Sequence, residues 1–147
     1  MRKSLVCVDA SIIISLITSE AQSQKALDLW TKWMQEDIHV VAPSLLSYEV
    51  TSALRRKVNR GVMSYEDARR SLEAFSSLDI EFFDQPDLPL RAYDIAFRFN
   101  LPAAYDAFYL AVSEMLECDF WTSDERLCNT VSRSFHNICW LRSVNSS

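Results

Sequence analysis

The sequence contains a single glycine, Gly61, among its 147 residues. Nucleotide-binding loops of the GxGxxG and GxxxxGK types need several glycines, because their backbone approaches phosphate closely. The chain therefore does not hold a nucleotide by a glycine-rich loop.

Closely spaced cysteine pairs are also lacking. The chain has two histidines, and its four cysteines show no CxxC spacing: they are Cys7, Cys118, Cys128 and Cys139. Structural zinc sites are built from close pairs of such ligands, so none is expected. We expect reduced cysteines that pack as small hydrophobic side chains.

Long apolar runs are missing as well. The runs at Leu5–Val8 and Ile12–Ile14 are far shorter than the ~20 residues that a membrane-crossing helix needs. Arg2 and Lys3 precede a short apolar stretch, but Asp9 interrupts it before the core of a signal peptide could form. We therefore expect a protein that does not engage a membrane and stays in the cytoplasm.

What the chain does have is an ordinary globular composition. Hydrophobic residues make up 49% and charged residues 24% of the sequence, which is typical of one folded core. No repeat, low-complexity tract or linker divides it. We predict one domain over residues 1–143 and a short C-terminal tail at 144–147.

Short apolar runs alternate with amphipathic stretches along the chain. The runs suit strands buried on both faces, and they lie at 4–8, 38–41, 80–83, 119–122 and 138–141. Helical patterns fall between them, starting near 11 and covering about 26–34, 46–58, 65–76, 87–99, 102–117 and 125–134. Gly61 suits the left-handed position after the third of these helices, and Ser64 suits the cap of the next. Strands that alternate with helices, without tight hairpins, predict an α/β fold with a parallel sheet.

Four acidic residues stand where an ordinary surface carboxylate is not expected. Asp9 and Asp124 directly follow predicted strands, at the edge where parallel sheets bind ligands. Glu49 lies beside the apolar stripe of its helix, and Asp106 begins a helix that is apolar nearly all round. Simpler interpretations stay open, because Asp9 and Asp124 could merely cap helices and the helix dipole could stabilise Asp106.

A cation would explain all four residues together. Carboxylates gathered in one crevice repel one another, and a hard divalent cation with oxygen ligands removes that cost. We therefore predict Mg²⁺ or Mn²⁺. The full chain has 20 acidic and 15 basic residues; without these four acids the numbers are 16 and 15, so the negative balance belongs largely to this site.

Basic residues cluster around the end of the Glu49 helix and on the following helix, and could contact phosphates. They are Arg55, Arg56, Lys57 and Arg60, together with Arg69 and Arg70. For any one of them a solvated basic face remains the simpler interpretation.

Four short motifs follow one another along the chain. A strand ends in Val8-Asp9-Ala10-Ser11, and a helix is expected over Pro43 through Val50. A block from Leu101 through Ala111 comes next, and then the triplet Thr122-Ser123-Asp124. In this order and at these separations the motifs resemble a PIN-domain ribonuclease of the VapC type, the toxin of toxin–antitoxin pairs. The resemblance spans nearly the whole chain, although Ala10 stands where threonine is frequent.

This resemblance implies a fold and a chemistry. The fold is a PIN-like three-layer α/β/α arrangement with a short, mainly parallel central sheet. The implied activity is Mg²⁺- or Mn²⁺-dependent endoribonuclease cleavage of cellular RNA, such as transfer RNA or another structured RNA. It also implies a homodimer that a cognate antitoxin inhibits. The implied metal ligands are Asp9, Glu49, Asp106 and Asp124, with Ser11 and Thr122 as hydroxyl neighbours that orient the site.

Three other interpretations remain open. The same carboxylates would serve a nuclease outside a toxin–antitoxin system, acting in RNA processing or on DNA. A catalytically vestigial module could instead bind a protein through aromatic residues such as Trp30, Trp33 and Phe75, although these are typical of a buried core. A ribonuclease that uses His39 and His136 for acid–base catalysis is the third.

Overall fold

A five-stranded parallel sheet forms the centre of the molecule in the computed structural model, which describes residues 4–144. Its strands are β1 (Leu5–Val8), β2 (His39–Ala42), β3 (Ile80–Phe82), β4 (Asp119–Thr122) and β5 (Ile138–Trp140). Every neighbouring pair of these strands runs parallel. The predicted α/β class and parallel sheet are confirmed.

The strand order, β3-β2-β1-β4-β5, places a topological switch point beside β1. The chain builds outward from β1 through β2 to β3, and then returns to the other side of β1 with β4 and β5. Connections on the two sides of such a point leave in opposite directions, which opens a crevice at the carboxyl ends of the strands. The residues that follow β1 and β4 therefore share one crevice.

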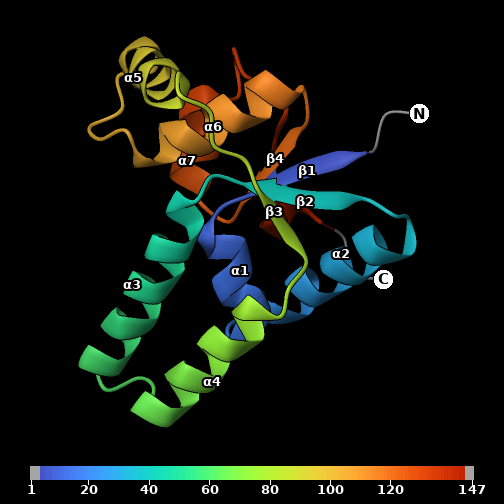
Figure 1. Cartoon of the computed structure of the whole chain (residues 1–147), viewed down its shortest axis with the longest axis vertical. Coiled ribbons are helices and arrows are strands. Elements are labelled where there is room, and N and C mark those ends of the chain that lie inside the picture. Colours follow the sequence, from blue (N-terminus) through green and yellow to red (C-terminus); the bar gives the residue numbers. More distant parts are fainter. Residues whose placement is uncertain (1–3, 145–147) are drawn as a thin grey trace.

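Helices cover both faces of the sheet and give the three-layer arrangement (Figure 1). Their bounds are α1 (Ala10–Ile17), α2 (Ser23–Gln35), α3 (Leu45–Asn59), α4 (Tyr65–Ser76), α5 (Leu88–Arg98), α6 (Tyr105–Leu116) and α7 (Glu125–Val131), with a 3₁₀ turn at Leu141–Ser143. Helix α6 packs on β1 and β4 with α5 against it, while α1 lies under β1 and β4 and contacts α2, α3 and α4. Figure 1 shows α3 and α4 extending away from the sheet as a pair. None of the helices in residues 4–144 combines the length and apolar character that crossing a bilayer would require.

The turn between α3 and α4 has the predicted form. Gly61 adopts φ of +72°, which a residue with a side chain takes up only with strain. The Ser64 hydroxyl accepts a hydrogen bond from the backbone N–H of Asp67 at 3.1 Å and so caps α4. These local signals fix where one helix ends and the next begins.

Two details differ from the prediction. Helix α6 begins at Tyr105 rather than at Pro102, because the residues before it reverse the chain so that α6 packs closely against α5. The strands are also not all buried on both faces: β3 is an edge strand whose Glu81 and Phe82 are exposed. An edge strand lacks a neighbour on one side and here also lacks full helix cover.

The core lies on both sides of the two central strands. The core includes Val8, Ile13, Leu110 and Phe120, each with 0% of its surface exposed. The aromatic residues Trp30, Trp33 and Phe75 are buried, at 8%, 3% and 8% exposure. All four cysteines are unpaired thiols, as expected. The assignment of residues 1–143 to one domain stays a prediction, and most of the predicted tail, 145–147, lies outside the described residues.

Candidate active site at the carboxyl edge of the sheet

Asp9 is the buried centre of the site. It follows β1, is 7% exposed, and caps α1 through Oδ1, which accepts hydrogen bonds from the Ser11 N–H at 3.0 Å and the Ser11 hydroxyl at 2.5 Å. Oδ2 accepts a hydrogen bond from the Thr122 hydroxyl at 2.6 Å. The capping interpretation is therefore confirmed for Asp9, but it uses only one of the two carboxylate oxygens.

The two hydroxyl residues join the ends of β1 and β4. Thr122 Oγ1 also accepts a hydrogen bond from the Asp124 N–H at 3.0 Å, and Ser11 Oγ accepts one from the Ser123 N–H at 2.8 Å. Asp9 is thus tied to the β4–α7 turn by two bridging hydroxyls. This network holds the Asp9 carboxylate in one orientation and brings Asp124 beside it.

Asp124 caps α7 and faces solvent. Its Oδ1 accepts a hydrogen bond from the Leu127 N–H at 3.0 Å. Among residues 4–144, no hydrogen bond is made by its second carboxylate oxygen. Capping is confirmed here too, and one oxygen remains free.

Glu49 has a partner that sequence reasoning did not identify. The hydroxyl of Tyr109, on α6, donates a short hydrogen bond to Glu49 Oε1 on α3. Tyr109 is fully buried. Burial raises the pKa of the phenol, and the hydrogen bond to Glu49 and the charge of that carboxylate raise it further, so the hydroxyl stays protonated and can donate. The three-residue spacing from Asp106 places Tyr109 on the same face of its helix as that acid, but it does not indicate the contact with Glu49 on another helix.

Asp106 lies between the other three carboxylates. It is the second residue of α6 and is half-buried. Within residues 4–144 its carboxylate accepts no hydrogen bond and pairs with no cation. Burial raises the pKa of Asp106, and repulsion from Asp124 and Glu49 raises it further. The helix dipole favours a charge at this position by only about 0.3–1 kcal/mol.

Burial and the charge of Asp106 act on Asp9 in the same direction. Desolvation raises the pKa of Asp9 to about 6, against the lowering effect of its hydrogen bonds from Ser11, Thr122 and the Ile12 N–H. We call the four carboxylates of Asp9, Glu49, Asp106 and Asp124 the acidic edge. Within the acidic edge, Asp106 takes part in every repulsion that raises the pKa of Asp9 or of Asp106 itself.

The side chains of the acidic edge do not form a closed metal cage. Within the described range, 4–144, no three or more Asp, Glu, His or Cys side chains stand in positions that would hold an ion. The donor chemistry nevertheless fits a hard divalent cation, since every donor is a carboxylate or hydroxyl oxygen. Asp106 accepts no hydrogen bond within residues 4–144, and Asp124 is exposed with one free carboxylate oxygen, so both have donor oxygens available to a cation.

The predicted phosphate-binding residues differ in availability. Arg55, Arg56 and Arg60 are exposed, and no carboxylate of residues 4–144 lies within ion-pair distance of them. Lys57 instead forms an ion pair of 2.6 Å with Glu20, and its side chain is only 16% exposed. Its ammonium is therefore committed to the turn between α1 and α2.

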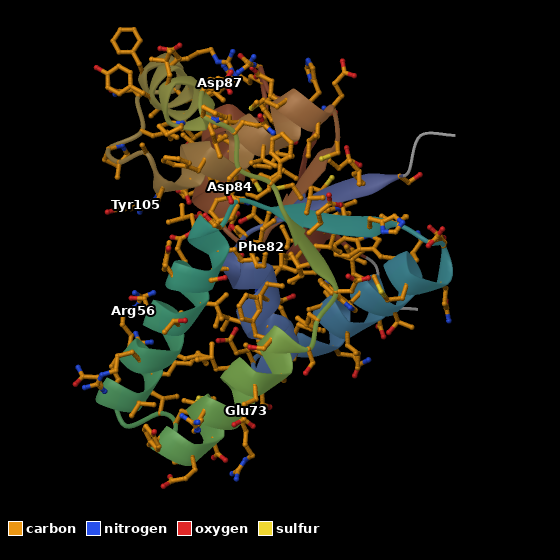
Figure 2. All side chains as sticks on the ribbon, in the orientation of Figure 1. Arg56, Glu73, Phe82, Asp84, Asp87 and Tyr105 are labelled. Atoms are coloured by element: carbon orange, nitrogen blue, oxygen red, sulfur yellow. The ribbon has the colours of Figure 1, made fainter. Side chains whose placement is uncertain are left out.

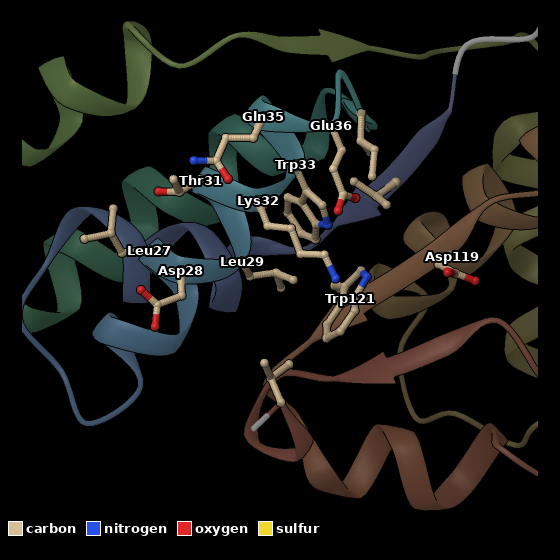
Figure 3. Close-up of a pocket in the computed structure, with 13 residues that line it drawn as sticks. Leu27, Asp28, Leu29, Thr31, Lys32, Trp33, Gln35, Glu36, Asp119 and Trp121 are labelled. Atoms are coloured by element: carbon tan, nitrogen blue, oxygen red, sulfur yellow. The ribbon is translucent and has the colours of Figure 1, made fainter. Parts of the chain in front are cut away.

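One cavity lies beside the acidic edge, and another lies at the opposite end of the strands. One, of about 430 Å³, lies beside the acidic edge between α3 and the start of α6 and includes Glu49 in its wall. A larger one, of about 710 Å³, lies between α2 and the first residues of β1 and β4. Figure 3 shows Lys32, Trp33 and Trp121 at its centre. It opens at the opposite end of the strands and contains none of the four carboxylates.

The two histidines do not form a catalytic pair. His39 begins β2 and His136 precedes β5, so both lie at the amino edge of the sheet. Two strands separate β2 from β5, and at about 4.8 Å per strand the two are roughly 14 Å apart. Neither lies at the acidic edge.

Parallel α/β sheets bind ligands in the crevice at the switch point, and comparison with known families identifies the class to which this one belongs. The model of the PIN domain matches residues 6–131. The chain belongs to the PIN-domain family.

The relatives narrow the class to the VapC group. A VapC ribonuclease of Mycobacterium bovis is 32% identical over 126 residues, which cover 86% of this chain and 91% of that protein. Among solved structures, a protein from Pyrobaculum aerophilum superimposes with a TM-score of 0.70 at 23% identity, covering 97% and 94% of the two chains. A toxin–antitoxin complex from Klebsiella pneumoniae gives a TM-score of 0.65 at 16% identity over 95% and 99%. The fold is confirmed, and the sequence relatives support a ribonuclease of the VapC type.

Proposed function

We propose that this protein is a Mg²⁺- or Mn²⁺-dependent endoribonuclease that acts as the toxin of a toxin–antitoxin pair. The observation that carries the proposal is the position of Asp106, which is half-buried, lacks a cation or hydrogen-bond partner in residues 4–144, and is repelled by the carboxylates around it. An arrangement that costs free energy in the isolated protein is explained if a divalent cation binds there.

The residues have separable roles in this proposal. Asp9, Glu49, Asp106 and Asp124 would hold the cation. When bound, Mg²⁺ or Mn²⁺ supplies Lewis-acid chemistry, polarising the phosphodiester and neutralising charge on the leaving oxygen.

The remaining polar groups position the carboxylates. Ser11 and Thr122 hold Asp9 in one orientation, and Tyr109 directs Glu49 toward the edge. Arg55, Arg56 and Arg60 would contact the RNA backbone, whereas Lys57 would do so only if its pair with Glu20 opened.

A cleavage assay tests the proposal. The purified protein is incubated with transfer RNA, ribosomal RNA and single- and double-stranded DNA, with Mg²⁺, with Mn²⁺ and with EDTA. RNA cleavage is expected only with metal, and Asp106→Asn should reduce the rate at least about a hundredfold. Asp79→Asn is the matched control, because Asp79 is an exposed aspartate remote from the edge.

The alternatives give different results in this cleavage assay and in a test of cell growth when the protein is expressed. Cleavage of DNA alone, or of RNA without growth arrest in cells, would favour a nuclease outside a toxin–antitoxin system. Growth arrest that survives replacement of all four carboxylates would favour a vestigial binding module. Full RNA cleavage in EDTA would exclude the metal-dependent chemistry.

The partners are part of the proposal. We expect an antitoxin encoded beside this protein to restore growth when the two are expressed together in the cytoplasm, since one structural neighbour is a toxin–antitoxin complex.

We also expect a homodimer. Helix α5 carries a second apolar face of Leu90, Tyr93 and Phe97, exposed at 65%, 67% and 82%, beyond the face that packs on α6. Exposed apolar patches of this kind mark interfaces, and Phe97→Glu should shift the mass measured by light scattering to that of a monomer.

A further inference from the structure

Two exposed tyrosines stand beside the acidic edge, each next in sequence to one of its carboxylates. Tyr48 precedes Glu49 on α3 and is 71% exposed, while Tyr105 precedes Asp106 on α6 and is 62% exposed. Neighbouring residues on a helix point about a quarter-turn apart. Each tyrosine therefore lies at the rim of the site whose floor its neighbour helps to form.

The two tyrosines line one groove together. The cavity of about 430 Å³ beside the acidic edge is bounded by Leu45, Tyr48, Glu49, Ser52, Arg56 and Tyr105. Its residues from α3 recur every three or four positions, so one face of that helix forms a wall, and Tyr105 stands across from it. Figure 2 shows Tyr105 and Arg56 on the same side of α3. We call this cavity the tyrosine groove.

The groove combines three kinds of chemistry. Glu49 belongs both to its wall and to the acidic edge, so the groove leads directly to the proposed cleavage site. Arg56 donates a hydrogen bond of 3.2 Å to Ser52 Oγ, one turn nearer to Glu49, which directs the guanidinium along the groove. In the described part of the chain Arg56 has no acidic partner, unlike Arg69, Arg70, Arg91 and Arg98.

We propose that the tyrosine groove binds an unpaired nucleotide of the RNA next to the cleaved phosphate, stacking its base on Tyr48 and Tyr105 and binding its phosphate with Arg56. This inference rests on the proposed ribonuclease function. Aromatic side chains stack on bases of any identity, and a base offers its faces only when it leaves a duplex. The substrate class is therefore RNA that is cleaved in a loop or another unpaired segment.

The first test is cleavage by leucine and phenylalanine variants. Tyr48→Leu and Tyr105→Leu should each raise KM about tenfold with little change in kcat, because stacking is lost while the acidic edge is intact. Tyr48→Phe and Tyr105→Phe keep the aromatic face and should restore KM. Tyr65→Leu is the matched control, since Tyr65 is 64% exposed on α4 and lies outside the groove.

The second test locates the stacked base. An abasic nucleotide beside the cleavage position should raise KM of the unmodified protein about as much as a leucine substitution does. In the leucine variants the same abasic nucleotide should add little further loss, because the contact is already absent. Arg56→Gln should reduce the slope of log affinity against log salt by about 0.7, the value for one phosphate contact on a single strand.

The third test does not depend on cleavage. A short single-stranded RNA that carries one 2-aminopurine is titrated in EDTA, where stacking quenches its fluorescence. Quenching by the unmodified protein, lost in Tyr48→Leu and kept in Tyr48→Phe, supports the groove even if no RNA is cleaved. Absence of cleavage by the unmodified protein with metal would count against the proposed function alone.

Four results would overturn the inference. The first is unchanged KM and unchanged quenching in both leucine variants of a protein that cleaves RNA. The second is loss in the phenylalanine variants equal to that in the leucine variants, which would assign the contact to the hydroxyls. The third is a change of oligomeric mass in the leucine variants, which would assign the groove to a second copy of the chain. The fourth is loss of antitoxin inhibition without loss of RNA affinity, which would assign it to the antitoxin.

Discussion

Replacing Asp9 with asparagine should abolish cleavage and at the same time stabilise the metal-free fold at neutral pH. The Asp9 carboxylate is 7% exposed, and its burial raises its pKa from 3.8 to about 6. Above pH 6 the folded protein must therefore keep a charge that is more stable in the unfolded chain. Asparagine has nearly the same shape and removes this charge.

The magnitude follows from the difference between the two pKa values. At 1.36 kcal/mol per pH unit, a rise from 3.8 to about 6 corresponds to a cost of about 3 kcal/mol at pH 7. The variant loses part of this gain, because an amide offers one acceptor oxygen where the carboxylate has two, at about 1–2 kcal/mol. A net stabilisation of about 1–2 kcal/mol remains, which is roughly 3–8 °C in Tm for a chain of this size.

The effect has a defined dependence on pH. Between about pH 4 and 6 the native Asp9 binds a proton that the unfolded chain has released, so the stability contributed by this group is complete below about pH 4 and is lost as the pH rises through 6. The Tm of Asp9→Asn minus that of the unmodified protein should therefore be positive at pH 7 and become negative near pH 4, where the cost of the charge is gone and the lost acceptor oxygen remains. Other acidic groups titrate in both proteins and largely cancel in this difference.

Thermal unfolding in EDTA at pH 4, 5, 6 and 7 measures this difference, with Asp79→Asn as an exposed control that should not change Tm. Added Mg²⁺ should raise the Tm of the unmodified protein and have little effect on Asp9→Asn. The reasoning is refuted if the metal-free variant is less stable than the unmodified protein at pH 7, or if its Tm difference is the same at every pH.

Three smaller perturbations test the supporting structure. Thr122→Val removes the hydroxyl that donates to Asp9, so it should lower the free energy of unfolding in urea by about 1–3 kcal/mol and slow cleavage. Thr122→Ser keeps the hydroxyl and should retain the stability and the cleavage rate. Equal behaviour of the two variants would contradict this role. Lys57→Met should destabilise the fold by about 1 kcal/mol but leave RNA affinity unchanged. A double-mutant cycle with Glu20→Gln should show coupling between the two residues, and additive changes in the free energy of unfolding would contradict the ion pair. Gly61→Ala should cost about 1 kcal/mol through its positive φ alone, since no atom lies within 4 Å of the added Cβ, and an unchanged midpoint would contradict that strain.

The fold class and most element bounds could be predicted because they depend on local patterns. Apolar runs and amphipathic periods place strands and helices within a few residues, Gly61 marks a turn, and Ser64 marks a cap. Asp9 and Asp124 could be assigned to one edge of the sheet for the same reason, since a residue that follows a parallel strand lies at its carboxyl end. These inferences need no knowledge of which strands are neighbours.

Tertiary packing decided the rest of the site. The strand order makes β1 and β4 neighbours, and only then can Thr122 reach Asp9, 113 residues away. The hydroxyl of Tyr109 on α6 reaches Glu49 on α3 across 60 residues of sequence. Helix periodicity could show that Glu49 lay beside an apolar stripe, but the donor that satisfies it belongs to another helix.

The basic cluster shows the same division. Arg56 and Lys57 are adjacent in sequence and equal in formal charge. Arg56 nevertheless lines the tyrosine groove, whereas the ammonium of Lys57 pairs with Glu20. The sequence by itself determined the fold class, most helix ends and the position of Asp9 and Asp124 at one sheet edge, because secondary structure and strand polarity follow from short-range backbone and side-chain patterns. Only the tertiary structure decided which of these charges are paired, which are buried and which line a groove, because pairing and desolvation depend on elements that are distant along the chain and adjacent in space.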